Sequence, residues 1–150
     1  MRLYLATLQL GSFRNYDSAT VHFSSGLNVL YGDNAQGKTN LLEAIHYLAT
    51  GRSHRTSRDQ DMIQEGRDEL LARAEVVRKT GTIDLELRYG LKTRKQLKIN
   101  GIAERKIARL VGSLAAVLFS PDDLQLLKGP PSGRRRFLDM ELSQNSQTYL

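Results

Sequence analysis

Eight consecutive residues near the start of the chain match the pattern G-x-x-x-x-G-K-[ST]. They are Gly32-Asp33-Asn34-Ala35-Gln36-Gly37-Lys38-Thr39. In this pattern the backbone amides between the glycines form a concave nest of donors around the β-phosphate of a nucleotide. Lys38 is expected to reach the β- and γ-phosphates, and the Thr39 hydroxyl is expected to bind Mg²⁺. The sequence therefore predicts a phosphate-binding loop.

The elements on both sides of this loop are those that a phosphate-binding loop requires. An apolar run over residues 27–31 predicts a strand before it, and a helical pattern begins near Lys38. The apolar residues of that pattern define one face, which is expected to pack on a sheet, and the pattern ends by Gly51. The first N–H groups and the positive end of the helix dipole favour an anion. A glycine-containing turn before an unrelated helix is the alternative, and the agreement of strand, loop and helix argues against it.

Composition limits the class of protein. A chain of 150 residues, 40% hydrophobic and 25% charged, is typical of one globular domain with a sizeable core. Because no apolar run approaches the roughly 20 residues of a membrane helix, and no export signal opens the chain, we expect a soluble, cytoplasmic protein without a membrane partner. The absence of cysteine excludes disulfides, thiolate metal sites and cysteine nucleophiles. The net charge of +6 favours a polyanion such as nucleic acid, although ordinary protein surfaces also carry such a charge.

The remaining pattern predicts strands first and helices last. Alternating leucines from Leu3 to Leu10 and the β-prone residues 20–23 indicate a first pair of strands. Three further strands, expected to form an antiparallel lobe distinct from the strand-loop-helix unit, lie at residues 70–79, 83–89 and 94–100. Asn100-Gly101 is the strongest hairpin signal in the chain.

The last third of the chain predicts a short helix, a strand and two further helices. The short helix covers about residues 104–111, and the apolar strand covers residues 114–119. Ser120 is expected to cap a helix that closes at Gly129, and Ser132 a second helix that carries three consecutive arginines.

Two groups of basic residues have open interpretations. Residues 51–61 form a polar segment that is either a solvated loop or a segment facing nucleotide or DNA, and its basic side chains are Arg52, His54, Arg55 and Arg58. The middle strands carry Arg88, Lys92, Arg94, Lys95 and Lys98. Alternating charges on strands usually mark the solvent face, and a role in nucleic-acid binding is the second interpretation.

Two short segments imitate other ATPase motifs. Residues 116–119 followed by Asp122 and Asp123 have the form of a Walker B strand, whose acid helps to hold Mg²⁺. Because Ser120-Pro121 displaces these acids into a helix start, capping is the favoured interpretation. Residues 142–147 are similar to the L-S-x-G-Q signature of ABC-type ATPases but lack its glycine, and we attribute the similarity to chance. No catalytic residue is therefore assigned.

A set of segments, in order along almost the whole chain, carries a family resemblance. These segments are Phe13-Arg14-Asn15-Tyr16, residues 26–45, Gly51-Arg52-Ser53-His54-Arg55-Thr56, Phe119-Ser120-Pro121-Asp122-Asp123-Leu124 and residues 129–139. With them the chain resembles the N-terminal part of the RecF family, recombination mediators related to ABC-type and SMC-like ATPases. The phosphate loop is shared by many ATPases, whereas the segments at residues 51–56 and 119–124 are far narrower.

The resemblance implies a fold and a set of ligands. The fold is an α/β P-loop NTPase, the N-terminal lobe of an ABC/SMC-like head, with an antiparallel β lobe at its side. The ligands are ATP and Mg²⁺, with Thr39 on the metal and with Arg14 implied to lie near the phosphates. Asn34 matches a loop asparagine of such heads, where it either shapes the backbone or contacts the ligand. The nucleotide-binding residues are then Gly32, Asp33, Asn34, Ala35, Gln36, Gly37, Lys38, Thr39, Asn40 and Arg14.

The resemblance also implies a function in DNA repair. Proteins of this family bind duplex DNA in an ATP-dependent manner, pair as head-to-head homodimers across two nucleotides, engage a RecR-like mediator protein and help to load recombinase at gaps. They continue into a helical arm, a signature segment and a Walker B strand, none of which is found in these 150 residues. Residues 1–150 are therefore expected to form the N-terminal lobe of a head, which binds ATP without appreciable turnover.

Two other functions stay open. A small P-loop phosphotransferase could use residues 52–58 as a closing lid, but it would need a second acidic metal ligand and an acceptor pocket. A DNA-binding module could use nucleotide only as a structural ligand, and its duplex binding would then be salt-dependent and indifferent to ATP.

Overall fold

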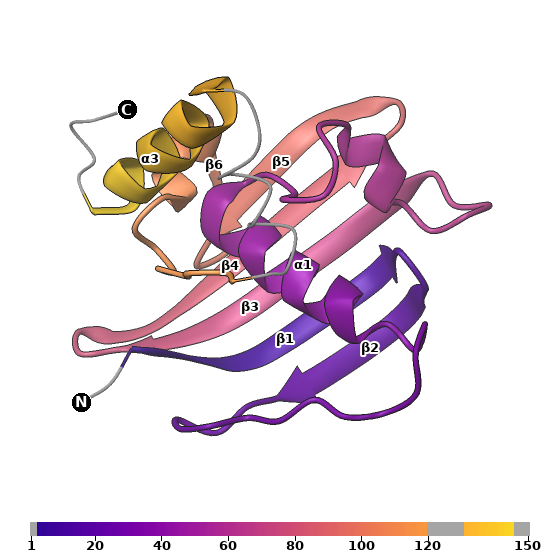
Figure 1. Cartoon of the computed structure of the whole chain (residues 1–150), viewed down its shortest axis with the longest axis horizontal. Helices are drawn as coiled ribbons and strands as arrows, with labels where there is room; N and C mark the ends of the chain where they lie inside the picture. Colours follow the sequence, from indigo (N-terminus) through magenta and orange to yellow (C-terminus); the bar gives the residue numbers. More distant parts are fainter. Residues whose placement is uncertain (1–2, 120–130, 146–150) are drawn as a thin grey trace.

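A six-stranded antiparallel sheet forms the main layer of the molecule (Figure 1), in a computed structural model that describes residues 3–119 and 131–145. Its strands are β1 (Tyr4–Phe13), β2 (Tyr16–His22), β3 (Glu69–Arg78), β4 (Gly81–Gly90), β5 (Thr93–Ile99) and β6 (Ile102–Glu104). Their order across the sheet is β2-β1-β3-β4-β5-β6. The predicted antiparallel lobe is confirmed, and it also includes the N-terminal hairpin, because β1 pairs with β3.

The strands are amphipathic, as their alternating sequence predicts. In β3, Leu70, Ala72, Ala74 and Val76 are buried, while the residues between them point to the opposite, solvent-facing side. The turn between β5 and β6 is built from Asn100 and Gly101, and both have positive φ, at 52° and 77°. This is the geometry for which an Asn-Gly pair is favoured in a two-residue hairpin, so the hairpin signal is confirmed.

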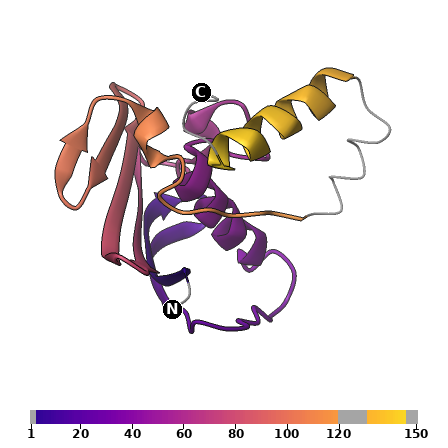
Figure 2. The ribbon, with the colours of Figure 1, turned by 90° about the vertical axis from the view of Figure 1, so that its left-hand side faces the viewer.

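The helix α1 (Lys38–Thr50) covers the apolar face of the sheet (Figure 2). The spacing predicted a buried face of Leu41, Leu42, Ile45, Leu48 and Ala49. Leu41, Leu48 and Ala49 are buried, but Leu42 is 42% exposed, and Ala44 and Tyr47 are buried as well. The helix therefore packs on the antiparallel lobe, and the two are not distinct units as the sequence had suggested. α1 ends where predicted, because Gly51 adopts a left-handed φ of 72° and its N–H donates to the Tyr47 carbonyl at 2.8 Å.

Shorter elements close the ends of the core. The 3₁₀ helices η1 (Asp59–Met62) and η2 (Ile107–Leu110) each bury one apolar residue completely, Met62 and Leu110. The short helix predicted at about residues 104–111 is present only as the 3₁₀ turn η2. The hairpin at Asn100-Gly101 returns the chain into β6, where Glu104 pairs with Leu97, and only one 3₁₀ turn follows.

The two strands predicted at residues 27–31 and 114–119 are not strands in the described part of the chain. Leu27, Tyr31 and Phe119 are instead 89%, 92% and 84% exposed. The physical reason is that a strand needs a neighbour for its backbone hydrogen bonds, and no described strand pairs with either segment.

The C-terminal helix α3 (Pro131–Asn145) lies on the same side of the sheet as α1 and farther from it (Figure 2). It confirms the predicted C-terminal helix, but Ser132 is not its cap, because α3 already begins at Pro131. The helix expected to start at Ser120, with Asp122 and Asp123, lies outside the described residues, as does the end of residues 142–147. Neither α1 nor α3 is long and apolar enough to cross a membrane.

Candidate nucleotide-binding site

The predicted phosphate loop leads directly into the N-terminus of α1. Gly32, Ala35 and Gly37 have positive φ values of 145°, 64° and 101°, so the backbone reverses its direction within six residues. Gly37 is the N-cap, and its carbonyl accepts the first helical hydrogen bond, from the Leu41 N–H at 2.9 Å. The first turn of α1 contains no acidic residue, and no side chain caps it. Its N–H groups and the positive end of the helix dipole therefore face the loop, and no carboxylate of that turn competes with a bound phosphate.

Lys38 and Thr39 follow the loop on the first turn of α1. The Lys38 Nζ donates to the carbonyls of Gly32 at 2.8 Å and Asp33 at 2.5 Å, so the ammonium lies across the start of the loop. The Thr39 side chain is exposed. The predicted loop residues Asp33, Asn34, Ala35 and Gln36 are exposed as well. The arrangement presents a cation, a hydroxyl and backbone donors on one accessible surface.

The turn between β1 and β2 supports the loop from the side. The Tyr16 hydroxyl donates to the Gly37 carbonyl at 3.2 Å, and the Asn15 side-chain amide donates to the Gln36 carbonyl at 3.4 Å. Asn40, predicted only as a nucleotide contact, donates from its own amide to Asn15 Oδ1 at 2.9 Å. These contacts tie the hairpin turn, the end of the loop and the first turn of α1 together.

The contact between this turn and Gly37 leaves no room for a side chain. A Cβ added to Gly37 would lie 2.8 Å from the Asn15 amide and 2.9 Å from the Tyr16 hydroxyl, and the residue has a left-handed φ of 101°. The left-handed φ favours glycine here, and a Cβ would force the ends of the Asn15 and Tyr16 side chains to move away from the loop.

We therefore expect Gly37→Ala to lower the free energy of unfolding by about 2–3 kcal/mol, from about 1–2 kcal/mol of left-handed strain and about 1 kcal/mol for the displaced Tyr16 hydrogen bond. Gly66→Ala is the control, because Gly66 has a φ of 77° with nothing within 4 Å of an added Cβ. It should show the strain alone, about 1–2 kcal/mol. Urea unfolding of both variants makes the comparison, and equal losses would show that the turn does not press on Gly37.

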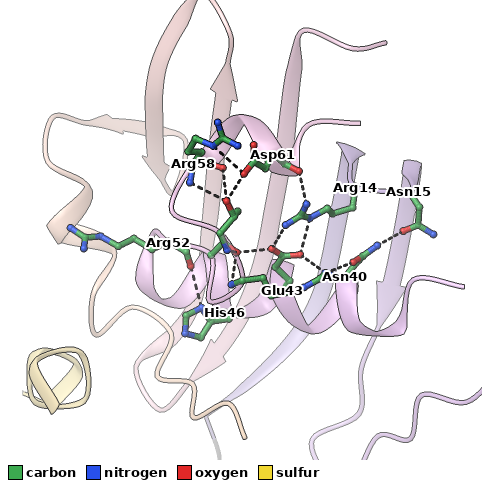
Figure 3. Close-up of polar contacts among 11 residues, drawn as sticks. Arg14, Asn15, Asn40, Glu43, His46, Arg52, Arg58 and Asp61 are labelled. Carbon is green, nitrogen blue, oxygen red and sulfur yellow. Dashed lines mark hydrogen bonds and ion pairs between the residues drawn. The ribbon is translucent and has the colours of Figure 1, made fainter. Parts of the chain in front are cut away.

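A buried carboxylate lies beneath this surface (Figure 3). Glu43, on α1, is completely buried, and both its oxygens are occupied. Arg14 forms a bidentate pair with it, from Nε to Oε2 at 2.9 Å and from Nη2 to Oε1 at 2.6 Å. Arg55 Nη1 donates to Oε2 at 3.1 Å, and the Ser53 hydroxyl donates to Oε1 at 2.6 Å. We call these four residues the Glu43 cluster.

Arg14 makes two hydrogen bonds in addition to its pair with Glu43. Its Nη1 also donates to the Asp61 carbonyl at 2.5 Å, and its backbone N–H donates to the Met62 carbonyl at 2.7 Å. The contact of Arg14 with nucleotide phosphates stays a prediction.

The polar segment at residues 51–61 is anchored to the cluster and to itself. Ser53 Oγ accepts from the backbone N–H groups of Arg55 and Thr56, at 2.9 and 3.2 Å. Arg55 also donates to Asn40 Oδ1 at 2.7 Å, and Arg58 pairs with Asp61 at 3.5 Å. The segment therefore lies against α1, with Arg55 reaching Asn40 on the first turn of that helix. Arg52 points away from Asn15 and Asn40 (Figure 3).

The electrostatics of Glu43 depend on its arginine partners. Burial alone would raise the pKa of the Glu43 carboxyl, but the hydrogen bonds from Arg14 and Ser53 and the charges of Arg14 and Arg55 hold that pKa below its ordinary value of 4.5. The ionised form is therefore the native one at neutral pH.

This lowered pKa makes part of the stability pH-dependent. Since the folded pKa lies below the unfolded one, the contribution of Glu43 is complete above about pH 4.5 and is lost as the pH falls through the folded value. We expect the stability difference between the original chain and Glu43→Gln to be constant from neutral pH to about pH 5 and to shrink at lower pH. Urea unfolding over this range tests it, and a difference that grows on acidification would contradict the assignment.

Three of the five basic residues predicted on the middle strands are paired with carboxylates. Glu86 binds Arg88 at 2.9 Å and Lys98 at 3.5 Å, and Lys95 binds Asp59 at 2.8 Å. Lys95 also lies over the Tyr47 ring, 4.9 Å from its centroid. The Glu86 pairs agree with the first interpretation, a solvent-facing side of the sheet. Lys95 does not, because it lies on the α1 side and donates to the Gly51 carbonyl at 2.6 Å.

Sequence reasoning found the loop but missed Glu43, Tyr16 and Ser53. Glu43 lies five residues after Lys38, on a helix that was predicted from the spacing of its apolar residues. A charged residue at a position that falls on the buried side of a helix was the available signal.

The comparisons with known proteins agree with this geometry. The family described as "AAA domain" matches residues 7–145. The DNA replication and repair protein RecF of Symbiobacterium thermophilum is 88% identical over 148 residues, which cover 99% of this chain and 40% of that protein. RecF of Bacillus subtilis is 45% identical with the same coverage. The chain therefore belongs to the AAA-domain family, and its relatives place it among the RecF-like members. It spans about 40% of the length of the curated relatives it matches.

Solved structures lead to the same class. The recombination mediator protein RecF with ATP, in the RecFOR pathway, superposes with a TM-score of 0.94 at 34% identity, over 99% of this chain and 40% of that one. An SMC ATPase structure superposes with a TM-score of 0.73 at 19% identity, over 95% of this chain and 99% of that one, and shows the shared fold. The predicted fold class, a P-loop NTPase with an antiparallel β lobe, is confirmed.

Proposed function

We propose that this chain is the nucleotide-binding part of an ATP-dependent DNA repair protein of the RecF type. The observation that carries the proposal is the phosphate loop, with Lys38 lying across it at the N-terminus of α1. The similarity to RecF with ATP, at 34% identity over 99% of the chain, supports ATP as the nucleotide.

The residues fit ATP with Mg²⁺. The positive φ values of Gly32 and Gly37 allow the backbone to approach a phosphate closely, and the first turn of α1 supplies free N–H groups. Lys38 would exchange its carbonyl partners for the β- and γ-phosphates, and the exposed Thr39 hydroxyl would bind Mg²⁺. The metal would neutralise phosphate charge.

Two apolar segments suggest that the ATPase core extends beyond these residues. The segments 26–30 and 114–116 line a cavity of about 380 Å³ together with α1 and the start of β1. In and directly after these segments, several apolar side chains are exposed: Leu27, Val29, Tyr31, Val117 and Phe119. We propose that they pair with strands of a larger head, which would also supply the Walker B acid and the signature segment. Residues 1–150 alone should then bind ATP without appreciable steady-state hydrolysis, and a clear rate abolished by Lys38→Ala would overturn this.

At the level of the whole protein, the proposal includes duplex DNA, a RecR-like mediator and an ATP-dependent head-to-head homodimer. The experiment is a titration of duplex DNA into the intact protein without nucleotide, with ADP and with ATP, at two salt concentrations. DNA affinity that rises with ATP supports the proposal. Salt-dependent affinity that is the same in all three states would instead favour a DNA-binding module with a structural nucleotide.

A further inference from the structure

Glu43 forms hydrogen bonds to residues that are far apart in the sequence. Its two oxygens accept four hydrogen bonds from three donors, which come from the β1–β2 turn and from the segment at residues 51–61. A carboxylate offers about four acceptor positions, so this one is saturated. A fully buried charge with complete hydrogen bonding fixes its partners in one arrangement.

A chain of hydrogen bonds leads from this carboxylate to the phosphate loop. Arg55 bridges Glu43 and Asn40 Oδ1, the Asn40 amide donates to Asn15 Oδ1, and the Asn15 amide donates to the Gln36 carbonyl. The chain therefore ends on the backbone of the loop itself. Figure 3 shows Glu43 and Asn40 on α1, with Asn15 beside Asn40 in the turn between β1 and β2.

A second branch leads away from the loop. Arg14 connects the same carboxylate to the Asp61 carbonyl, and Asp61 in turn accepts from the Thr56 hydroxyl at 2.5 Å. The segment at residues 51–61 is thus held at Ser53, Arg55 and Asp61, and each of these contacts leads to Glu43. A displacement of the loop would reach the segment through Arg55, which Glu43 holds in place. Lys95 anchors the segment separately, through the Gly51 carbonyl at 2.6 Å.

The charge of the cluster favours a positioning role over stabilisation. Two guanidinium groups share one carboxylate, so a surplus positive charge remains, and Arg55 is 42% exposed. Buried ion pairs contribute little net stability compared with apolar residues of the same volume. What the cluster achieves is a fixed location for two cations beside the loop.

We propose that Glu43 is a positioning residue, which holds Arg14, Arg55 and the segment at residues 51–61 against the phosphate loop and couples nucleotide binding to the order of that segment. This proposal rests on the proposed nucleotide site.

The test is hydrogen exchange of the intact protein, with and without saturating Mg·ATP, read on peptides from the loop and from residues 51–61. In the original protein nucleotide should protect both. In Glu43→Gln the loop should still be protected at saturation, while the added protection of residues 51–61 is lost. The affinity for ATP should fall about tenfold, which corresponds to ~1.4 kcal/mol.

Glu86→Gln is the matched control, because Glu86 also holds two cations, Arg88 and Lys98, but lies on the opposite face of the sheet between the buried Leu85 and Leu87. It should leave both the affinity and the coupled protection unchanged. If Glu43→Gln does not fold, Arg55→Gln is the second variant. It removes the hydrogen bonds that the half-exposed Arg55 side chain makes, and it should reduce the coupling in the same way.

The outcomes separate the two proposals. If the original protein does not bind ATP, the proposed function fails. The positioning role is then tested without nucleotide: residues 51–61 should exchange faster in Glu43→Gln than in the original protein. Residues 51–61 that respond to ATP equally in Glu43→Gln and in the original protein would overturn the proposed coupling. Equal exchange without nucleotide would overturn the positioning role itself.

Discussion

Replacing Lys38 with alanine is expected to weaken ATP binding at least ~100-fold, which corresponds to about 2.7 kcal/mol. The ammonium is the cation placed on the loop, 2.8 Å from the Gly32 carbonyl, and it would make charge-assisted hydrogen bonds to two phosphates. Each such bond contributes about 1.5–3 kcal/mol. Fluorescence titration with a labelled ATP analogue, competed by ATP, measures the effect.

Lys79→Ala is the control for Lys38→Ala. Lys79 is an exposed lysine in the turn between β3 and β4, and its removal changes the net charge by the same amount. It should leave the affinity unchanged within about twofold, since an exposed charge at a distance is screened by salt. Equal affinities for the two variants would exclude a phosphate-binding role for Lys38.

Replacing Glu43 with alanine is expected to destabilise the fold by about 3–5 kcal/mol, because the change leaves the Arg14 guanidinium in a partly buried position without its bidentate partner. For a chain of 150 residues this corresponds to a fall of roughly 6–20 °C in Tm. Differential scanning calorimetry and urea unfolding measure the loss.

The comparison for this prediction is Glu86→Ala. Glu86 pairs with Arg88 and Lys98, whose side chains are both 43% exposed, so we expect a loss of about 1 kcal/mol or less. The Arg14→Ala variant should cost about as much as Glu43→Ala, and the double variant less than the sum of the two single ones. Additive losses would mean that the two side chains do not interact in solution.

The parts of the fold that could be predicted are those set by local sequence. The phosphate loop, α1 with its Gly51 end and the Asn100-Gly101 hairpin each depend on residues within one turn or one helix. The period of the side chains was enough to predict β3, β4 and β5 within one or two residues.

The incorrect predictions concern segments whose structure depends on distant partners. Residues 27–31 and 114–119 have strand-like sequences, but a strand forms only beside another, and in the described part of the chain neither has one. The helix expected at about residues 104–111 is shortened to the 3₁₀ turn at residues 107–110, since Glu104 belongs to β6, which pairs with β5.

The supporting half of the site could not be predicted because its contacts span long sequence separations. Arg14 and Glu43 are 29 residues apart, and Asp61 follows 18 residues later. The RecF resemblance implied a role for Arg14 near phosphates, but no sequence pattern indicated that a buried carboxylate would hold it. The turn between β1 and β2 meets α1 through side chains, since Arg14 and Asn15 hydrogen-bond to Glu43 and Asn40.

The measurement that tests the central claim most directly is calorimetric titration of the folded chain with ATP, in the presence and absence of Mg²⁺. We predict one ATP per chain, with an affinity that Mg²⁺ increases and that Lys38→Ala removes. A chain that is folded by circular dichroism and yet binds no ATP under either condition would contradict the assignment of residues 32–39 as a nucleotide site.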